Sequence, residues 1–266
     1  MPAVPAPPLP ETCCATLWLR PGEALYAGPS LGLARHSGSV SCLAVGVDGA
    51  FTVETDGRER TVRSALVAAR TPHRLVSAGR MVFCYFDPAS AREHGCRAAM
   101  TAAEGPVHHG HEHEPELVHA AGALFAPGTD PEHWTELVSP LRTVTVDERV
   151  LLATRRLLAH PDRTLPAAGL AAEAGLSPSR FLHLFREHTG TSFRRYRLWA
   201  RMLRAGTLLA ARRGLTEAAA DAGFASPSHL SDSFHAMFGL RPSRLLATGV
   251  AIRVPEGPGH SWSSAR

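Results

Sequence analysis

One pattern occurs twice in the C-terminal third of the chain, and it limits the folds open to this region more than any other feature. A short helix-forming run is followed by a glycine, an apolar residue, a serine and a proline over residues 170–178, and again, with one added alanine, over residues 216–227. The glycine permits a sharp turn, while serine suits the cap and proline the first turn of a following helix. The repeat therefore predicts two helix-turn-helix units, joined by one long helix over residues 192–211.

Further helix signals surround this repeat. Thr145 is followed three residues later by Glu148, which is a capping-box pattern. The apolar spacing after it predicts an amphipathic helix of about four turns that ends at His160-Pro161. A shorter helix is predicted over residues 167–174, and the helix that begins at Pro178 is expected to end near Gly190.

The second helix of each predicted unit has an apolar face and a polar face. At about 100° per residue the apolar side chains fall on one stripe, which we expect to form core. The opposite faces are free to contact DNA bases. The residues predicted to contact DNA are Ser179, Arg180, Leu182, His183 and Arg186 in the first unit and Ser228, His229, Ser231, Asp232 and His235 in the second, with Arg194 and Arg195 as candidate phosphate contacts.

Asp232 stands out among these residues because it is acidic. A carboxylate is repelled by phosphates but accepts a hydrogen bond from cytosine N4. The second unit is therefore expected either to bind DNA more weakly than the first or to specify a cytosine.

The charge of the chain is divided between its two halves. From residue 141 onward there are 18 Arg and 9 acidic residues, a difference of 18 − 9 = +9, whereas residues 1–140 carry 10 Arg and 15 acidic residues, a difference of 10 − 15 = −5. A basic C-terminal region favours a polyanionic partner such as double-stranded DNA, although basic domains that are merely solvated are also common.

Residues 145–248 resemble the AraC/XylS family of bacterial transcription regulators. The resemblance rests on Ala174-Gly175-Leu176-Ser177-Pro178-Ser179, Phe181-Leu182-His183-Leu184-Phe185-Arg186, Thr189-Gly190, Phe193-Arg194-Arg195-Tyr196, Ala222-Gly223-Phe224, Phe234, Phe238-Gly239 and Pro242-Ser243. It implies two helix-turn-helix subdomains whose second helices enter successive major grooves, roughly 34 Å apart along the DNA. It also implies a homodimer formed through the N-terminal half, and RNA polymerase is a candidate partner.

The N-terminal half has the pattern of a β-sheet domain. Short apolar or alternating runs at residues 41–47, 51–55, 65–69 and 81–86 are separated by turn signals. They predict a small barrel or jelly roll, and residues 25–29 and 71–74 resemble the cupin-like sensing domains found in regulators of this kind. The predicted fold class is thus α+β. The predicted organisation is a disordered Pro-rich segment at residues 1–14, a sensing domain at 15–140, the DNA-binding domain at 141–248 and a flexible tail at 249–266.

Residues 89–141 are expected to form loops and short helices, and they contain an unusual histidine-rich tract at 108–119. Imidazole and thiolate groups suit Zn, Ni, Co or Cu, although such tracts are often merely polar loops. The candidate ligands for a metal effector are His94, Cys96, His108, His109, His111 and His113.

Other function classes are less favoured. An enzymatic cupin centre needs several converging ligands, but only His36 and His73 stand near such positions, and a turn or core role is preferred for His73. Neither a long apolar run nor a secretory signal is apparent, so a cytoplasmic protein without membrane association is expected. Sequence analysis therefore predicts a DNA-binding regulator without enzymatic activity, controlled by a small-molecule or metal effector. A metal-sensing or metal-buffering protein and a cupin enzyme fused to DNA-binding helices are the alternatives.

Overall fold

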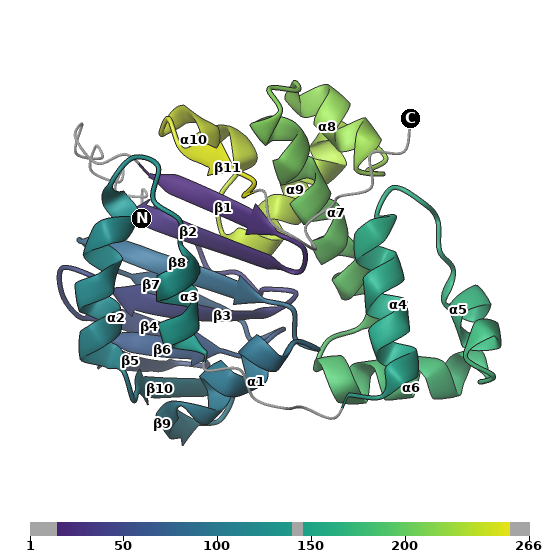
Figure 1. Cartoon of the computed structure of the whole chain (residues 1–266), viewed down its shortest axis with the longest axis horizontal. Helices are drawn as coiled ribbons and strands as arrows, with labels where there is room; N and C mark the ends of the chain where they lie inside the picture. The colour runs from purple at the N-terminus through teal and green to yellow at the C-terminus, as the bar shows by residue number, and fades with distance from the viewer. Residues whose placement is uncertain (1–14, 140–145, 256–266) are drawn as a thin grey trace.

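The computed structural model describes residues 15–139 and 146–255, and places an N-terminal β-sheet domain beside a C-terminal array of helices (Figure 1). The predicted α+β class is therefore confirmed. The segments predicted to be disordered (1–14) or to lead into the helical domain (140–145) lie outside the described residues, as does Thr145.

Two sheets form the N-terminal domain. The larger has the order β11-β1-β2-β8-β3-β6-β10-β9 and the smaller β5-β4-β7. The strands are β1 (Thr16–Arg20), β2 (Glu23–Pro29), β3 (Ser41–Gly46), β4 (Phe51–Thr55), β5 (Arg58–Val62), β6 (Ser64–Val67), β7 (His73–Val76), β8 (Arg80–Phe86), β9 (Met100–Glu104), β10 (Val107–His111) and β11 (Ala251–Arg253).

The central strands of the larger sheet are buried on both faces. All six residues of β3 are buried. Because side chains alternate along a strand, Leu43 and Val45 pack with the helices on the outer face, while Cys42 and Ala44 face the opposite side. This two-sided burial explains why β3 and β8 appear in the sequence as continuous apolar runs.

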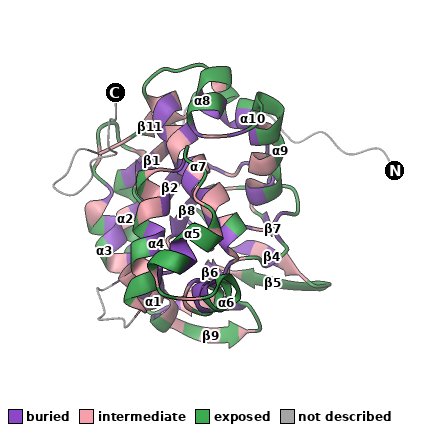
Figure 2. Cartoon of the chain, turned by 90° about the vertical axis from the view of Figure 1, so that its right-hand side faces the viewer, coloured by how far each residue is buried: buried purple, intermediate pink, exposed green. Residues whose placement is uncertain are grey.

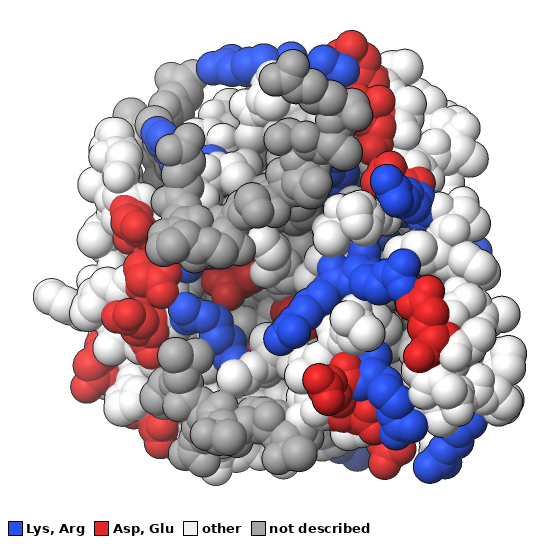
Figure 3. All heavy atoms as spheres, turned by 45° about the vertical axis from the view of Figure 1, so that its right-hand side comes forward, with Lys and Arg blue, Asp and Glu red and all other residues white. Residues whose placement is uncertain are grey.

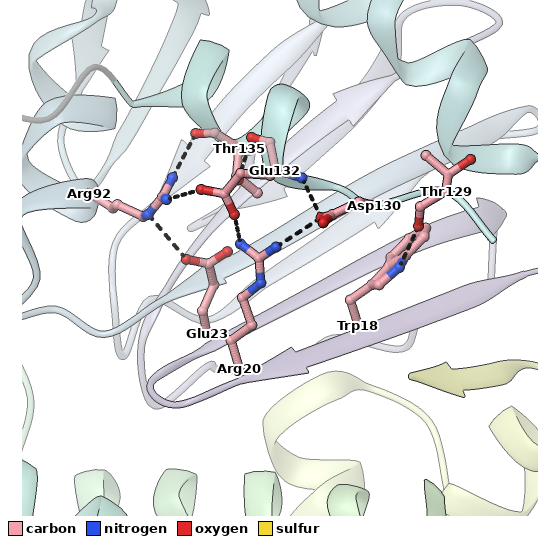
Figure 4. Close-up of polar contacts among 8 residues, drawn as sticks. All are labelled: Trp18, Arg20, Glu23, Arg92, Thr129, Asp130, Glu132 and Thr135. Atoms are coloured by element: carbon pink, nitrogen blue, oxygen red, sulfur yellow. Dashed lines mark hydrogen bonds and ion pairs between the residues drawn. The ribbon is translucent and has the colours of Figure 1, made fainter. Parts of the chain in front are cut away.

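Helices cover the outer face of the larger sheet. They are α1 (Ala91–Ala98), α2 (Glu114–Ala121), the 3-10 helix η1 (Gly122–Phe125) and α3 (Glu132–Val138). Polar contacts help hold this cover in place: Arg20 of β1 pairs with Glu132, which also accepts a hydrogen bond from Arg92 at 2.9 Å (Figure 4). The Trp18 indole donates to the Thr129 carbonyl at 3.2 Å.

The histidine-rich tract is not the loop that the sequence predicted. Residues 107–111 form β10, which pairs with β9 on one side and with β6 on the other. The histidine side chains leave the backbone N–H and C=O groups free to pair with the neighbouring strands, so the polar composition concealed the strand.

The C-terminal helices are α4 (Glu148–Ala159), α5 (Ala167–Glu173), α6 (Pro178–Thr189), α7 (Phe193–Ala210), α8 (Leu215–Asp221), α9 (Pro227–Phe238) and α10 (Pro242–Ala247). Helices α4 to α7 follow the predicted boundaries closely. The cap of α4 was predicted wrongly, because Asp147 occupies the cap position and its side chain accepts from the Arg149 backbone N–H. An arginine beside this carboxylate holds the pKa of Asp147 down to about 2.

The helices divide between two cores. Helices α4, α5 and α6 surround a core of their own that includes Phe181 and Phe185, together with the N-terminal part of α7. The rest of α7 and the helices α8 to α10 share a continuous core with the inner face of the β-sheets. Figure 2 shows exposed positions on the outward sides of these helices and buried ones where they pack.

The segment after α10 is not simply a tail. Residues 251–253 form β11, which pairs in parallel with β1, so the chain returns to the edge of the N-terminal sheet. The prediction of a flexible tail was wrong for these three residues, while residues 256–266 lie outside the described part. The two halves of the molecule therefore share a sheet as well as a core.

Candidate nucleic-acid interface

The first unit consists of α5, a tight turn and α6. Gly175 has φ +65°, a conformation that favours glycine, and the Leu176 N–H donates to the Ala171 carbonyl at 2.9 Å to close the turn. The Ser177 side chain caps α6 by accepting from the Arg180 backbone N–H at 3.3 Å. The outward face of α6 is formed by the predicted residues, which are all exposed: Ser179, Arg180, Leu182, His183 and Arg186.

The second unit repeats this construction with α8 and α9. Gly223 has φ +79°, the Phe224 N–H donates to the Ala219 carbonyl at 2.9 Å, and Ser226 caps α9. Ser228, His229, Asp232 and His235 are exposed, and Ser231 is half-buried. The predicted residues of each unit thus share one helix face, although only DNA binding can test their roles.

The two faces differ in charge. The face of α6 carries Arg180 and Arg186, whereas the face of α9 carries Asp232. An arginine that sequence analysis missed contacts this acidic side chain: Arg241 Nη1 lies 3.4 Å from Asp232 Oδ1 and donates to Ser231 Oγ at 3.2 Å. Figure 3 shows one face of the molecule, on which arginine side chains are interspersed with acidic ones.

The comparisons with known proteins agree with this geometry. The family model of a helix-turn-helix domain matches residues 170–248, which contain the second unit and all of the first except the start of α5. The HTH-type transcriptional regulator GlxA of Rhizobium meliloti is 36% identical over 90 residues, which cover 32% of this chain and 26% of that protein. The matched segment thus spans about a quarter of that regulator.

The chain thus contains a helix-turn-helix domain at residues 170–248. Its fold over almost the whole length is similar to that of ToxT from Vibrio cholerae O395, with a TM-score of 0.56 at 12% identity, covering 90% of this chain and 98% of ToxT. A structure of ToxT with a bound unsaturated fatty acid matches with a TM-score of 0.51 at 12% identity, covering 91% and 98% of the two chains. At this identity the likeness concerns the fold alone.

The two predicted phosphate contacts lie in different surroundings. Arg194 is exposed. Arg195 is half-buried, and its Nη1 donates to Ser37 Oγ at 3.0 Å and to the Gly38 carbonyl at 3.2 Å. Burial lowers the pKa of Arg195, with nearby Arg70 as a second cause. Arg195 therefore connects the linker helix α7 to the N-terminal domain.

Residues 34–38, here named the docking loop, also contact the end of α9. The Ala34 N–H donates to the Gly239 carbonyl at 2.9 Å, and the Ser37 N–H donates to the Ala236 carbonyl at 3.2 Å. A Cβ atom at Gly239 would lie 2.8 Å from His36 Nδ1, so this position, with φ +76°, requires glycine for close approach. The docking loop therefore fixes α9 relative to the β-sheets.

His36 and His73 support the docking loop. Their backbones exchange two hydrogen bonds of 2.9 Å, and their ring centroids are 4.3 Å apart. Burial lowers the pKa of His73 to about 4, helped by neighbouring His36 and Arg35 and opposed by a hydrogen bond to the Thr71 carbonyl. Burial also lowers the pKa of His36, and His235 of α9 adds to this shift. The core role preferred for His73 agrees with its 3% exposure.

A second connection between the halves is buried. The Tyr196 hydroxyl of α7 donates to Asp87 Oδ2 at 2.6 Å, just beyond the end of β8. Burial raises the pKa of both groups, although the hydrogen bond from Tyr196 opposes the rise at Asp87. Sequence analysis missed this pair because 109 residues separate its members.

The candidate metal ligands occupy different elements. His94 and Cys96 lie on α1, and the remaining candidates lie on or just after β10, where His108 and His109 point to opposite faces of the sheet. His111 Nε2 bonds to the Val138 carbonyl at 2.9 Å, and Arg97 donates to His108 Nε2 at 3.0 Å. Burial raises the pKa of the Cys96 thiol. Within residues 15–139 and 146–255, no group of three or more His, Cys, Asp or Glu side chains is arranged to hold a metal ion.

An apolar cavity of about 90 Å³ lies between the β-sheet domain and the helices. Its lining comes from β1, β2, β8 and β11 on one side and from α7, α8, α9 and α10 on the other, and includes Leu17, Tyr26, Phe83, Trp199, Met202 and Phe238. No charged side chain of the described residues lines it. Helices α4 to α6 contribute no residue to this lining, so the cavity belongs to the second unit and the β-sheets.

No helix among the described residues is long and apolar enough to cross a bilayer.

Proposed function

We propose that this protein is a sequence-specific transcription regulator that reads double-stranded DNA with α6 and α9. The observation that supports this most is the duplicated unit, in which each second helix is capped, packed by its apolar stripe and exposed along its polar face. Helix α7 packs in both cores and so holds the two units in a fixed relation. The proposed site is two short boxes about one helical turn apart, roughly 10 base pairs.

Selection of bound sequences from a random DNA library tests this proposal. The full chain is required, because α8 to α10 share their core with the N-terminal domain. We expect enrichment of two boxes with this spacing, and weaker binding by His183→Ala and Ser228→Ala. His133→Ala, a change of an exposed histidine on α3, serves as the control and should bind as the unmodified protein does. Binding that depends on salt without any enriched sequence would contradict the proposal.

We propose further that the effector is a small apolar molecule that enters the cavity between the two halves. Two observations support this: the lining is apolar on both sides, and ToxT, which shares the fold, has been crystallised with an unsaturated fatty acid. A dry apolar cavity of about 150 Å³ holds a molecule such as benzene. At about 90 Å³ this cavity holds less, so an effector would have to move α7 and α9 away from the sheet.

The absence of charge from the described lining predicts a preference within this class. A carboxylate buried there would lack a partner, which is unfavourable in an apolar environment. We therefore expect decanol to change the DNA affinity at a lower concentration than decanoate does. Met202→Trp, which fills the cavity, should abolish the response to both. A response to decanoate alone would contradict the proposed class.

The described residues do not support a metal effector, and no observation favours the metal-buffering or fused-enzyme alternatives. Homodimer formation and contact with RNA polymerase stay predictions from the family resemblance.

A further inference from the structure

Helix capping does not explain the presence of Arg241. It is the N-cap residue of α10, but its side chain makes no capping hydrogen bond. Serine, threonine, asparagine and aspartate are preferred at such positions, and the first unit has Ser192 at the equivalent place before α7. A long cationic side chain at an N-cap is also poorly placed relative to the helix dipole. The local structure therefore gives no reason for an arginine here.

The side chain instead extends over the polar face of α9. Its Nη1 donates to Ser231 Oγ at 3.2 Å and lies 3.4 Å from Asp232 Oδ1. The ion pair is exposed, with 60% of the Arg241 side chain and 70% of the Asp232 side chain accessible. The Arg241 guanidinium thus lies beside Asp232, the one acidic side chain that α9 carries.

Most hydrogen-bonding capacity of Arg241 is unused. A guanidinium carries five N–H donors in a rigid plane. Only Nη1 has a partner among the described residues, so Nε and Nη2 are free to donate. A planar fork of this kind matches the O6 and N7 acceptors of guanine in the major groove. A carboxylate that holds one nitrogen reduces the freedom of the side chain before DNA binds.

We propose that Arg241 reads a guanine in the groove entered by α9, with Asp232 as the residue that positions it. This inference rests on the proposed function. It assigns a specificity-determining residue outside the recognition helix and gives Asp232 a role other than direct contact with cytosine.

The test measures affinity of the full chain for its selected DNA and for every single-base change in the second box. We expect the unmodified protein to prefer guanine at one position by roughly 5- to 150-fold, and Arg241→Ala to remove that preference while leaving the first box unchanged. Arg241→Lys should lose it too, because an ammonium lacks the planar fork. Asp232→Asn should reduce the preference partially. Arg244→Ala, an exposed arginine on the same short helix, is the control for loss of charge.

A contact of Arg241 with phosphate would give a different result. Arg241→Ala would then weaken binding to all sequences equally and reduce the salt slope by about one, as expected of the Arg244 control if it contacts phosphate. With base preferences intact at both boxes, that outcome would overturn the assignment of Arg241 alone. An unmodified protein without preference at either box would overturn the proposed function. Thermal unfolding of each variant shows whether the fold is retained.

Discussion

The two helix-turn-helix units have the same local construction but different surroundings. Each has a glycine turn, a serine cap and a left-handed glycine at the end of its second helix. The first unit closes its own aromatic core, in which Phe185 contacts the rings of Phe181, Phe193 and Tyr196. The second unit has no separate core, because Leu230 and Met237 of α9 join the cluster that contains the β-sheets. The same local construction therefore occurs in one unit that packs around its own core and in another that shares its core with the β-sheet domain.

This difference has a consequence for regulation. The docking loop and the apolar cavity both contact the second unit. The N-terminal part of α7 instead contacts the β-sheet domain through polar side chains, namely Tyr196 and Arg195. An effector in the cavity would therefore act first on α9 and its position relative to α6. If both helices fit adjacent grooves at once, as proposed, a small displacement of one is sufficient to weaken binding.

The largest effect that distinguishes the units should come from their cores. Phe185→Ala and Trp199→Ala each remove a fully buried ring, which costs about 3–5 kcal/mol. We expect Phe185→Ala to increase amide hydrogen exchange in α4, α5 and α6 and to leave β8 protected. Trp199→Ala should increase exchange in α9 and β8 together, since its ring lies 6.2 Å from Tyr85 and 6.5 Å from Phe238.

Leu152→Ala is the control for these variants, because Leu152 is an apolar residue of α4 that is 54% exposed. It should change stability by no more than about 0.5 kcal/mol. Increased exchange in α9 without any change in β8 on replacing Trp199 would show that the second unit is as independent as the first.

A smaller difference should appear with pH. The pKa of His73 is about 4 in the folded protein and near 6.5 when unfolded, so the unfolded chain takes up a proton first as the pH falls. Stability should therefore decrease by roughly 3 kcal/mol between pH 6.5 and pH 4, and be fully present above that range. The groups facing His73 and His36 are Arg35, His235 and the Thr71 carbonyl, which offer no negative charge to stabilise the proton.

Hydrogen exchange of α9 and α6 across this pH range measures the effect. Because the buried histidines of the described residues are His36, His73 and His111, the loss should be seen at α9 rather than at α6. His73→Phe should reduce the pH dependence and leave the parts due to His36 and His111. Equal destabilisation of both helices in the unmodified protein would contradict a role for the docking loop.

The sequence predicted what local signals control. The bounds of α6 and β4 were predicted correctly, because a serine followed by proline, a left-handed glycine and a turn signal each act on neighbouring residues. The two units were predicted for the same reason, and a helix-turn-helix domain is confirmed at residues 170–248. The residues predicted to contact DNA share exposed faces, and their contacts stay predictions.

What the sequence did not predict depends on contacts between distant segments. Strand β11 exists because it pairs with β1, more than two hundred residues earlier in the chain. In the sequence, Arg195 is one of several arginines of a basic helix, and only the fold places Ser37 beside it. Arg241 lies beyond the end of α9 and reaches its face only because the chain reverses at Gly239. No local sequence pattern predicts such contacts between separate segments.

The smallest effect concerns neighbouring arginines with different partners. Arg194→Ala removes an exposed cation and should reduce the salt slope of DNA binding by about one. Ser37→Ala removes one of the acceptors that hold Arg195, at 3.0 Å, and should free this side chain for phosphate. We expect affinity to rise about 2- to 5-fold, since one such hydrogen bond contributes roughly 0.5–1 kcal/mol net.

Fluorescence anisotropy at several salt concentrations measures both variants. A rise in affinity for Ser37→Ala means that the docking loop withholds Arg195 from DNA, so that the N-terminal domain limits binding even without an effector. A fall would mean that the loop instead holds Arg195 in the orientation that DNA requires. In that case the β-sheet domain supports DNA binding rather than restraining it, and an effector would act by strengthening the contact between the two halves.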